Sequence, residues 1–487
     1  MLSKTDDTPP TPPARLNFAE YVLRQGRHDK IALAVVGTLR AERWSYERLR
    51  SAVVETAAGL LERGVVPGDR VLIRIGNTVD FPIVHLGAAW MGAIPIPTAS
   101  GLTVPEVERI ASEASPVLTV ATPGIAVPGG PIVSPPALRT GGTAMPHDSA
   151  ADDPAYIVYT SGTSGHPRGV VHAHRAVWAR RMMHGGWYGL SERDRLLHAG
   201  AFNWTYTLGT GVLDPLSVGA TALIPAEGTQ ASQLPLLLRR HGATIFAAAP
   251  GVYRRMLRTD ALDLPDLRHG LSAGEKLPEV TRRRWEEATG TRVHEAFGMT
   301  ECSTFISGSP DRPAPFGSSG YPQPGRRVAV LGPDGPVPRG APGIIAIDRS
   351  DPGLMLGYLG AEDESLAKHD GEWFLTGDTG SMSAAGAITY LGRDDDMMNA
   401  GGFRVSPLEV EAAFDGMTSV CAAVERRLSE DTSIIALCFE GDVDESELRA
   451  LAGSILAPHK RPRLYERREV PRNANGKLNR RALRSAP

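Results

Sequence analysis

Residues 159–169 read YTSGTSGHPRG and follow an apolar run at 155–158 that predicts a buried strand. Glycines let a backbone approach an anion closely, hydroxyls can donate hydrogen bonds to it, and Arg168 can neutralise its charge. The hydroxyl donors are Thr160, Ser161, Thr163 and Ser164, and the glycines are Gly162, Gly165 and Gly169. The segment lacks the Walker pattern GxxxxGK[ST], so it predicts a polyphosphate loop of another kind. A flexible surface loop is the alternative for a stretch this rich in glycine and serine.

The composition is that of a globular protein, with 42% apolar and 22% charged residues. A chain of 487 residues exceeds what one ordinary core accommodates, so two or more domains are expected. The formal net charge is only −3, with both signs mixed along the chain. No nucleic-acid or membrane partner is therefore expected, and any phosphate binding must be local.

The three cysteines, Cys302, Cys421 and Cys438, are odd in number and have no C-x-x-C spacing. They indicate neither a disulfide framework nor a zinc site, and they suit a reducing cytoplasm. There is no run of about 18 apolar residues, and the N-terminus carries acids and prolines where a signal peptide is apolar. We therefore expect a cytoplasmic chain that does not cross a membrane.

The order of patterns along the chain predicts an α/β fold. Threonines and prolines at 5–13 cannot build a helix or a ladder, so residues 1–15 are expected to form a disordered arm. Beyond it, amphipathic helical segments such as 45–64 alternate with short β-rich runs such as 71–75. A second alternating region spans 156–347, which favours further α/β structure.

The last third of the chain changes character. Glycines and prolines at 332–343 predict turns of a small β subdomain. After Arg393, a helix at 407–414 and strands at 419–424 and 433–439 are enough for a small α+β lid that moves. The predicted parts are a disordered arm at 1–15, an N-terminal domain at 16–392 and a C-terminal lid at 393–487.

Further segments combine with the first loop into one ordered pattern. They are SAGEK at 272–276, AFGMTE at 296–301, TGD at 376–378, GRDDD at 392–396 running on to Glu411, and PRNANGK at 471–477. Together they resemble the acyl-adenylate-forming (AMP-binding) superfamily, in its acyl-CoA synthetase branch. TLG at 207–209 and PLSVG at 215–219 are somewhat like benzoate-type ligases. The resemblance covers nearly the whole chain.

The resemblance implies a nucleotide site in which each residue type suits its task. Phe297 would stack on adenine, Thr300 would bind the α-phosphate, and Glu301 would hold Mg²⁺. Asp378 and Arg393 would grip the ribose hydroxyls. The implied ATP- and AMP-binding residues are Thr160, Ser161, Gly162, Thr163, Ser164, Gly165, Arg168, Gly274, Glu275, Phe297, Gly298, Thr300, Asp378 and Arg393. The chain departs from the family in Arg168, where lysine is usual, and in Phe297, where tyrosine is more frequent.

The resemblance also implies two half-reactions that use ATP, Mg²⁺ and CoA. A carboxylic acid would become an acyl-adenylate with release of pyrophosphate, and the acyl group would then pass to the CoA thiol. The implied catalytic residues are Lys477, Thr300 and Glu301. Gly401, Gly402 and Arg404 would line the pantetheine tunnel, and Asp395 would be the hinge on which the lid turns between the two steps.

The sequence defines the carboxylic acid substrate less well than it defines the nucleotide site. By position in the family, the acyl pocket would be lined by Phe202, Asn203, Trp204, Tyr206 and Ala273. Such a bulky lining favours a compact acid, either aromatic, cyclic or of short to medium chain length. These aromatic residues could equally belong to the core. A standalone enzyme that loads an aryl or amino acid onto a carrier protein is the alternative function, and a homodimer is left open.

Overall fold

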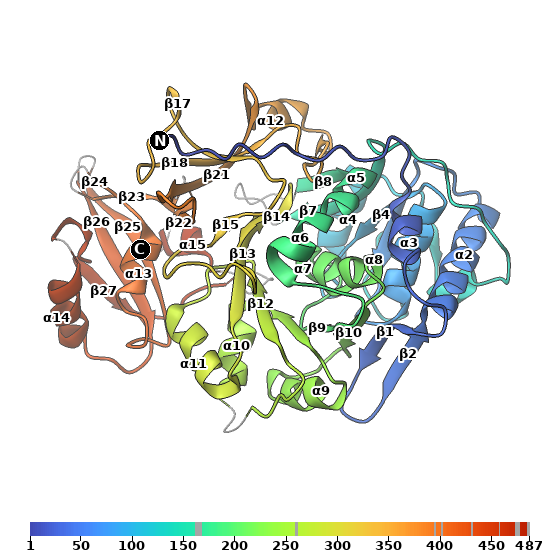
Figure 1. Ribbon diagram of the computed structural model, residues 1–487, viewed down its shortest axis with the longest axis horizontal. Coiled ribbons are helices and arrows are strands. Elements are labelled where there is room, and N and C mark those ends of the chain that lie inside the picture. Colours follow the sequence, from blue (N-terminus) through green and yellow to red (C-terminus); the bar gives the residue numbers. More distant parts are fainter. Residues whose placement is uncertain are drawn as a thin grey trace.

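The computed structural model describes residues 1–160, 168–258, 262–393, 396–400, 403–429, 432–456, 458–472 and 478–484. The predicted α/β class is confirmed: helices pack against several separate sheets, and the C-terminal part forms a unit at one end of the molecule (Figure 1).

The largest sheet has nine strands, and its middle strands run parallel. In spatial order they are β15 (Tyr321–Pro322), β14 (Ser303–Ser307), β13 (Val293–Met299), β12 (His269–Ala273), β11 (Ile245–Ala248), β9 (Arg195–His198), β10 (Thr221–Pro225), β1 (Ile31–Val36) and β2 (Ala41–Ser45). Parallel strands place their carboxyl ends at one edge of a sheet, where ligands of α/β proteins bind. Gly274 and Phe297 lie at or just beyond the carboxyl ends of β12 and β13.

A second sheet, whose strands run parallel, lies in the N-terminal part of the chain. Its strands are β4 (Ile94–Pro97), β3 (Arg70–Arg74), β5 (Leu118–Ala121) and β6 (Ile132–Val133). Helix α2 (Tyr46–Glu62) begins at Ser45, whose side chain accepts from the Arg48 N–H, and it buries Leu49, Val53, Ala57 and Leu60 at helical spacing. The helices packed around these two sheets are α1 (Phe18–Leu23), α3 (Asp80–Trp90), α4 (Val104–Ala114), α5 (His174–Ala179), α6 (Arg181–Met183), α7 (Thr205–Leu208), α8 (Asp214–Ser217), α9 (Leu234–Arg240), α10 (Pro250–Met256) and α11 (Glu279–Thr289).

Two smaller sheets complete the large part. The hairpin of β7 (Pro154–Thr160) and β8 (Arg168–Ala173) flanks the predicted phosphate loop, and β8 also pairs with β19 (Gly357–Tyr358). The predicted β subdomain contains β16 (Val328–Gly332), β17 (Gly335–Pro336), β18 (Pro342–Asp348), β20 (His369–Asp370), β21 (Trp373–Met382) and β22 (Ile388–Arg393), with α12 (Glu362–Leu366) beside it.

The C-terminal unit has its own hydrophobic clusters, whose buried members all lie between Met398 and Leu483. Its elements are β23 (Met398–Ala400), β24 (Phe403–Val405), α13 (Pro407–Ala412), β25 (Val420–Ser429), β26 (Thr432–Glu440), α14 (Glu445–Ile455), β27 (Leu464–Arg467) and α15 (Arg480–Arg484). The domain boundary at 393 stays a prediction.

The N-terminal segment differs from the disordered arm that we expected for residues 1–15. It runs extended along the β subdomain, with bridges from Leu2 to Pro338 and from Lys4 to Ala329, and Arg15 bridges to Ala150 (Figure 1). The side chain of Ser3 is buried. Prolines prevent a helix but permit an extended chain, and here the free strand edge of β16 supplies the missing hydrogen-bond partners.

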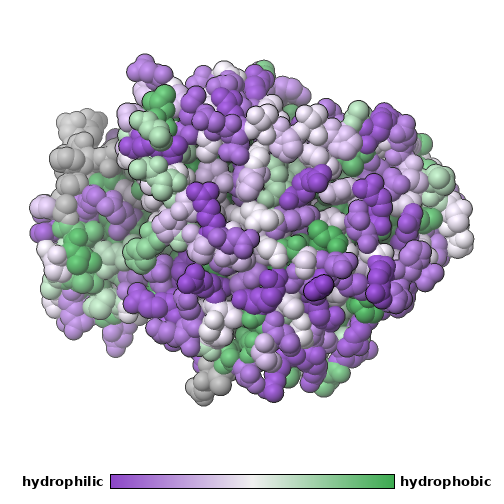
Figure 2. All heavy atoms as spheres, viewed as in Figure 1, coloured by the Kyte–Doolittle hydropathy of each residue, from purple (hydrophilic) through white to green (hydrophobic). Residues whose placement is uncertain are grey.

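In the part of the chain that the structure describes, no helix has both the length and the apolar character needed to cross a membrane. One face of the molecule is mostly hydrophilic, with apolar residues in small, separate patches (Figure 2).

Candidate active site

A cavity of about 1460 Å³ lies where the large part meets the C-terminal unit. Its walls come from the carboxyl ends of β12 and β13, from β21 and β22, from α13, and from residues near α15. The predicted site residues on these walls are Thr160, Arg168, Gly274, Glu275, Phe297, Gly298, Thr300, Glu301, Asp378 and Arg393. Segments far apart in the sequence, from Thr160 to Arg484, thus meet in one cavity.

Several predicted residues lie outside the described part of the chain. They are Ser161, Gly162, Thr163, Ser164, Gly165, Asp395, Gly401, Gly402 and Lys477. Arg404 is placed only through its backbone, which pairs with Asn399 between β24 and β23. Their roles remain predictions.

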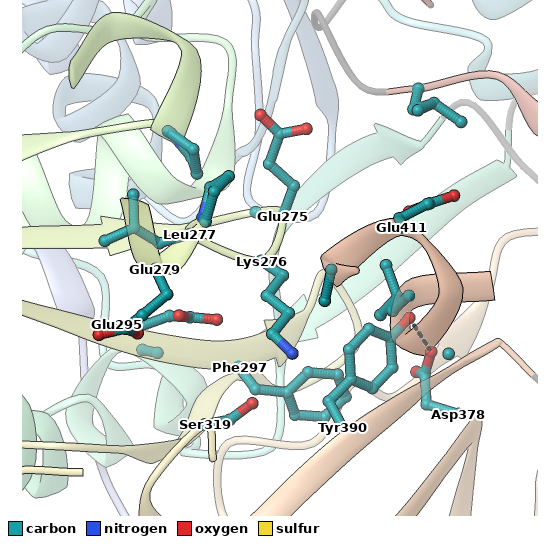
Figure 3. Close-up of a pocket in the computed structure, with 18 of the residues that line it drawn as sticks. Glu275, Lys276, Leu277, Glu279, Glu295, Phe297, Ser319, Asp378, Tyr390 and Glu411 are labelled. Atoms are coloured by element: carbon teal, nitrogen blue, oxygen red, sulfur yellow. Dashed lines mark hydrogen bonds between the residues drawn. The ribbon is translucent and has the colours of Figure 1, made fainter. Parts of the chain in front are cut away.

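An aromatic wall is present where adenine is expected. The ring of Phe297 lies 5.1 Å from that of Tyr390 and 5.4 Å from that of Phe305, measured between centroids. The Phe297 and Tyr390 side chains face each other, and the amine of Lys276 reaches towards them (Figure 3). Phe297 is half-buried, so one part of its ring stays available to stack on a base.

Asp378 lines the cavity and is 4% exposed. It is the direct cross-strand neighbour of Arg393, whose Nε lies 3.7 Å from Oδ1 of Asp378, and the Tyr390 hydroxyl donates to the same oxygen at 3.3 Å (Figure 3). Burial raises the pKa of Asp378 to about 6, although Arg393 and Tyr390 oppose this shift. A carboxylate beside a guanidinium offers acceptors and donors suited to vicinal hydroxyls.

Thr300 and Glu301 occupy the tight turn between β13 and β14. Oε1 of Glu301 accepts a hydrogen bond of 2.7 Å from the Tyr358 hydroxyl, and its backbone carbonyl accepts from the Met355 N–H at 2.7 Å. The Glu301 side chain is half-buried and has a second oxygen that Tyr358 does not engage. One oriented carboxylate facing a nucleotide cavity fits Mg²⁺, which typically takes its other ligands from phosphates and water.

Arg168, at the carboxyl end of the predicted phosphate loop, is oriented by two partners. Its guanidinium carbon lies 5.4 Å from the centroid of the Tyr358 ring, and Nη2 forms a 2.6 Å ion pair with Glu364 of α12. The planar guanidinium can both stack on a ring and form this ion pair. The family's usual cation is thus replaced by one that is fixed beside Tyr358 and Glu301.

The sequence model of the family described as "AMP-binding enzyme" matches residues 20–359. The chain belongs to the AMP-binding enzyme family. It is 31% identical to the benzoate–CoA ligase of Thauera aromatica, with 91% of each chain covered. It is 30% identical to the 4-hydroxybenzoate–CoA/benzoate–CoA ligase of Rhodopseudomonas palustris, with 97% of this chain and 93% of that protein covered.

Solved structures agree with this membership over the full length of the fold. ATP-bound MatB from Rhodopseudomonas palustris superimposes with a TM-score of 0.87 at 25% identity, covering 96% of this chain and 98% of that one. A benzoate CoA ligase from Burkholderia xenovorans LB400 gives a TM-score of 0.85 at 27% identity, with 96% and 100% covered. The resemblance stated from the motifs is therefore confirmed.

The predicted acyl-pocket residues of this AMP-binding enzyme do not line the cavity. Phe202 is 1% exposed and stacks on Phe81 at 5.3 Å, inside the N-terminal core. The Tyr206 hydroxyl donates to the Leu271 carbonyl at 3.1 Å, and Trp204 packs edge-on against the Tyr206 ring at 5.2 Å. Ala273 belongs to the same cluster as these two rings, and Asn203 is half-buried. These side chains pack against one another and against the N-terminal core, and their assignment to an acyl pocket stays a prediction.

Sequence reasoning missed four residues of the site: Tyr358, Tyr390, Lys368 and Arg480. Lys368 lines the cavity near Gly377, where a Cβ would lie 3.7 Å from the lysine Nζ. Arg480 forms a bidentate pair with Glu411 at 2.8 and 2.7 Å. None of the four lies in the motifs as we delimited them. Only the pairing of β8 with β19 and of β21 with β22 brings the two tyrosines to the cavity.

Proposed function

We propose that this AMP-binding enzyme is an ATP-dependent acyl-CoA ligase that activates a compact, aromatic carboxylic acid. The proposal rests on one cavity beside the C-terminal unit. The aromatic wall, the buried carboxylate of Asp378 that would bind the ribose, and the Thr300–Glu301 turn all line it. The relatives named as benzoate–CoA ligases support the aromatic acid.

The chemistry follows from the weakness of a carboxylate as an acyl donor. One oxygen of the substrate carboxylate attacks the α-phosphorus of ATP, the bond to the β-phosphate oxygen breaks, and pyrophosphate leaves with that electron pair. Catalysis here consists of positioning and charge stabilisation. Thr300 donates to an α-phosphate oxygen, Arg168 neutralises the departing pyrophosphate, and Asp378 with Arg393 holds the ribose. Mg²⁺, held through Glu301, would offset the charge of the phosphates when bound.

In the second step the thiol of CoA adds to the acyl carbonyl, its proton is lost, and AMP leaves. We assign Lys477 to the first step, and Gly401, Gly402 and Arg404 to the second. We expect the two sets to need different geometries, so the 393–487 unit would turn about Asp395 between the steps. The self-contained hydrophobic clusters of this unit support its movement as one body.

The proposal includes a cytoplasmic location, since Cys302, Cys421 and Cys438 are all free thiols. The acid pocket would open next to the Trp204–Tyr206 cluster, which lies beside Ala273 and hence close to Gly274 on the cavity wall.

Pyrophosphate release tests the function. Purified protein with ATP and Mg²⁺ is assayed against aromatic, cyclic and aliphatic acids, each with and without CoA. We expect release that depends on a small set of aromatic acids and that turns over only when CoA is added. A stoichiometric burst that ignores CoA would instead favour loading of a carrier protein, and no release with any acid would contradict the proposed activity.

A further inference from the structure

A buried ion pair that the proposed mechanism does not use lies behind the Thr300–Glu301 turn. Arg180, just after α5, donates from Nε and Nη2 to the two carboxylate oxygens of Asp214 at 2.8 and 2.6 Å. The side chains are only 6% and 2% exposed. Tyr188 adds a hydrogen bond of 2.7 Å to the same carboxylate. A guanidinium held this way inside the protein has one fixed position.

The remaining arm of this guanidinium points at the active-site turn. Nη1 of Arg180 donates to the hydroxyl of Ser303, which is the first residue of β14 and lies two positions after Glu301. Met299 and Ser303 are cross-strand neighbours, so Thr300, Glu301 and Cys302 form a three-residue loop between them. Arg180 therefore anchors one end of the loop that presents Thr300 and Glu301 to the cavity.

The backbone of Ser303 adopts an unfavourable conformation, so a contact that holds this residue in place is needed. Its φ is +64°, in the left-handed region that three-residue hairpin loops require after their turn and that glycine usually fills. Among the described residues, Ser115 at the end of α4 is the one other non-glycine residue with a positive φ. At position 303 a side chain is kept despite this cost, and its hydroxyl is the group that Arg180 binds.

The neighbouring chain leaves room for Arg180. A Cβ at Gly209 would lie 2.3 Å from the guanidinium carbon and 2.4 Å from Nη2 of Arg180. Any larger residue at position 209 would displace the guanidinium that holds Ser303. A substitution at Gly209 should therefore move the guanidinium of Arg180 while its charge is retained.

We propose that Arg180 is a positioning residue which, through the Ser303 hydroxyl, fixes the turn that presents Thr300 and Glu301 to Mg²⁺-bound ATP. This inference rests on the proposed function. It assigns a role to a pair, Arg180 and Asp214, that lies outside every nucleotide motif of the chain. Its consequence is that binding of the magnesium–nucleotide complex depends on a hydroxyl that touches neither metal nor nucleotide.

Calorimetric titration with ATP, in the presence and absence of Mg²⁺, tests the inference on Ser303→Gly. Glycine tolerates the left-handed backbone, which offsets part of the cost of removing the acceptor of Arg180, so the fold should be retained. Loss of a hydrogen bond to a charged group should weaken binding of MgATP roughly tenfold, and should weaken binding of ATP without Mg²⁺ less, because Thr300 contacts the α-phosphate directly whereas Glu301 acts through the metal. In pyrophosphate release the Mg²⁺ requirement should rise, with KM for the acid unchanged.

Three further variants separate positioning from general strain. Ser115→Gly relieves the same kind of backbone strain far from the cavity and should leave MgATP affinity unchanged. Ser303→Asn tolerates the left-handed region and retains an acceptor for Arg180, so it should restore most of the affinity. Gly209→Ala should reproduce the MgATP defect of Ser303→Gly because it displaces the guanidinium.

The outcomes distinguish this inference from the proposed function. If the unaltered protein binds no MgATP, the nucleotide site and with it the proposed function fail. If the unaltered protein binds MgATP and Ser303→Gly binds it equally well, the nucleotide site stands and the positioning role of Arg180 is wrong. An equal loss in Ser303→Gly and Ser303→Asn would also overturn it, since the acceptor would then not matter.

Discussion

The Tyr358 hydroxyl donates a 2.7 Å hydrogen bond to Oε1 of Glu301, joining β19 to the turn between β13 and β14. Through β8, the same tyrosine is tied to the phosphate-loop hairpin, and Arg168 stacks over its ring. The predicted magnesium carboxylate and the predicted phosphate cation are thus oriented by one residue. No sequence motif had pointed to it.

Tyr358→Phe should impair the use of Mg²⁺. The ring that supports Arg168 remains, but Glu301 loses one fixed partner, so the Mg²⁺ concentration that gives half-maximal pyrophosphate release should rise by about fivefold, the equivalent of one ordinary hydrogen bond. Tyr46→Phe is the matched control, because it removes a tyrosine hydrogen bond to Ala220 far from the cavity. If both variants keep the original Mg²⁺ requirement, Tyr358 does not orient Glu301.

Protonation of Asp378 should lower the activity at acid pH, which appears as an acid limb in the pH profile of kcat/KM for ATP. Burial raises its pKa to about 6, so the carboxylate gains a proton as the pH falls through that value. The charged acceptor for the ribose hydroxyls is then lost, and kcat/KM for ATP, which reports the free enzyme, should fall below about pH 6. Asp378→Asn should show a lower kcat/KM without this limb. A limb that persists in Asp378→Asn would assign it to another group.

The burial of Asp378 also makes the stability of the protein depend on pH, but stability falls as the pH rises, whereas activity falls as the pH drops. The folded-state pKa of Asp378 lies above the ordinary value of 3.8, so the folded state binds more protons than the unfolded state between about pH 4 and pH 6. The contribution of Asp378 to stability is therefore present at low pH and is lost as the pH rises through about 6. In the nucleotide-free protein, Asp378→Asn should relieve this loss and raise the melting temperature near neutral pH.

The stability of the C-terminal unit should depend on the buried ion pair between Glu411 and Arg480. Both side chains are largely buried, at 13% and 14% exposed, and Glu411 also accepts from the Ala423 N–H at 2.8 Å. Arg480→Met leaves an unpaired buried carboxylate and should cost about 3 kcal/mol. Hydrogen exchange in α13 and β25 should accelerate, while exchange in β3 and β5 stays unchanged.

Glu445→Ala provides the comparison for that pair. It breaks the exposed i,i+4 bridge to Arg449 in α14, which should be worth less than about 0.5 kcal/mol. Similar exchange rates in Arg480→Met and Glu445→Ala would contradict a stabilising role for the buried pair.

Lys477→Ala should impair the first half-reaction but not the second. If Lys477 bridges carboxylate and phosphate oxygens, the variant should lose formation of the acyl-adenylate but still convert supplied acyl-adenylate to acyl-CoA at nearly the original rate. Gly402→Trp, intended to obstruct the predicted pantetheine tunnel, should show the reverse. An equal loss in both half-reactions for Lys477→Ala would refute this division.

The motifs, the fold class and several elements could be predicted because they depend on local sequence. Helix α2 follows from its apolar spacing and Ser45 cap, and Phe297 and Glu301 follow from one contiguous motif. Tyr390 and Tyr358 could not be predicted, since only non-local strand pairing carries them to the cavity. The packing of the aromatic residues around Tyr206 against one another also depends on the folded chain, and their spacing in the sequence does not reveal it.

The most direct test of the account follows the oxygen atoms of the acid. The aromatic acid that supports pyrophosphate release is labelled with oxygen-18 in its carboxylate and incubated with the enzyme, ATP, Mg²⁺ and CoA, and the products are examined by mass spectrometry. Attack of the carboxylate on the α-phosphorus predicts one labelled oxygen in AMP, unlabelled pyrophosphate, and one labelled oxygen in the acyl-CoA. Label in inorganic phosphate with ADP as the other product, or acyl-CoA formed with unlabelled AMP, would contradict an acyl-adenylate intermediate.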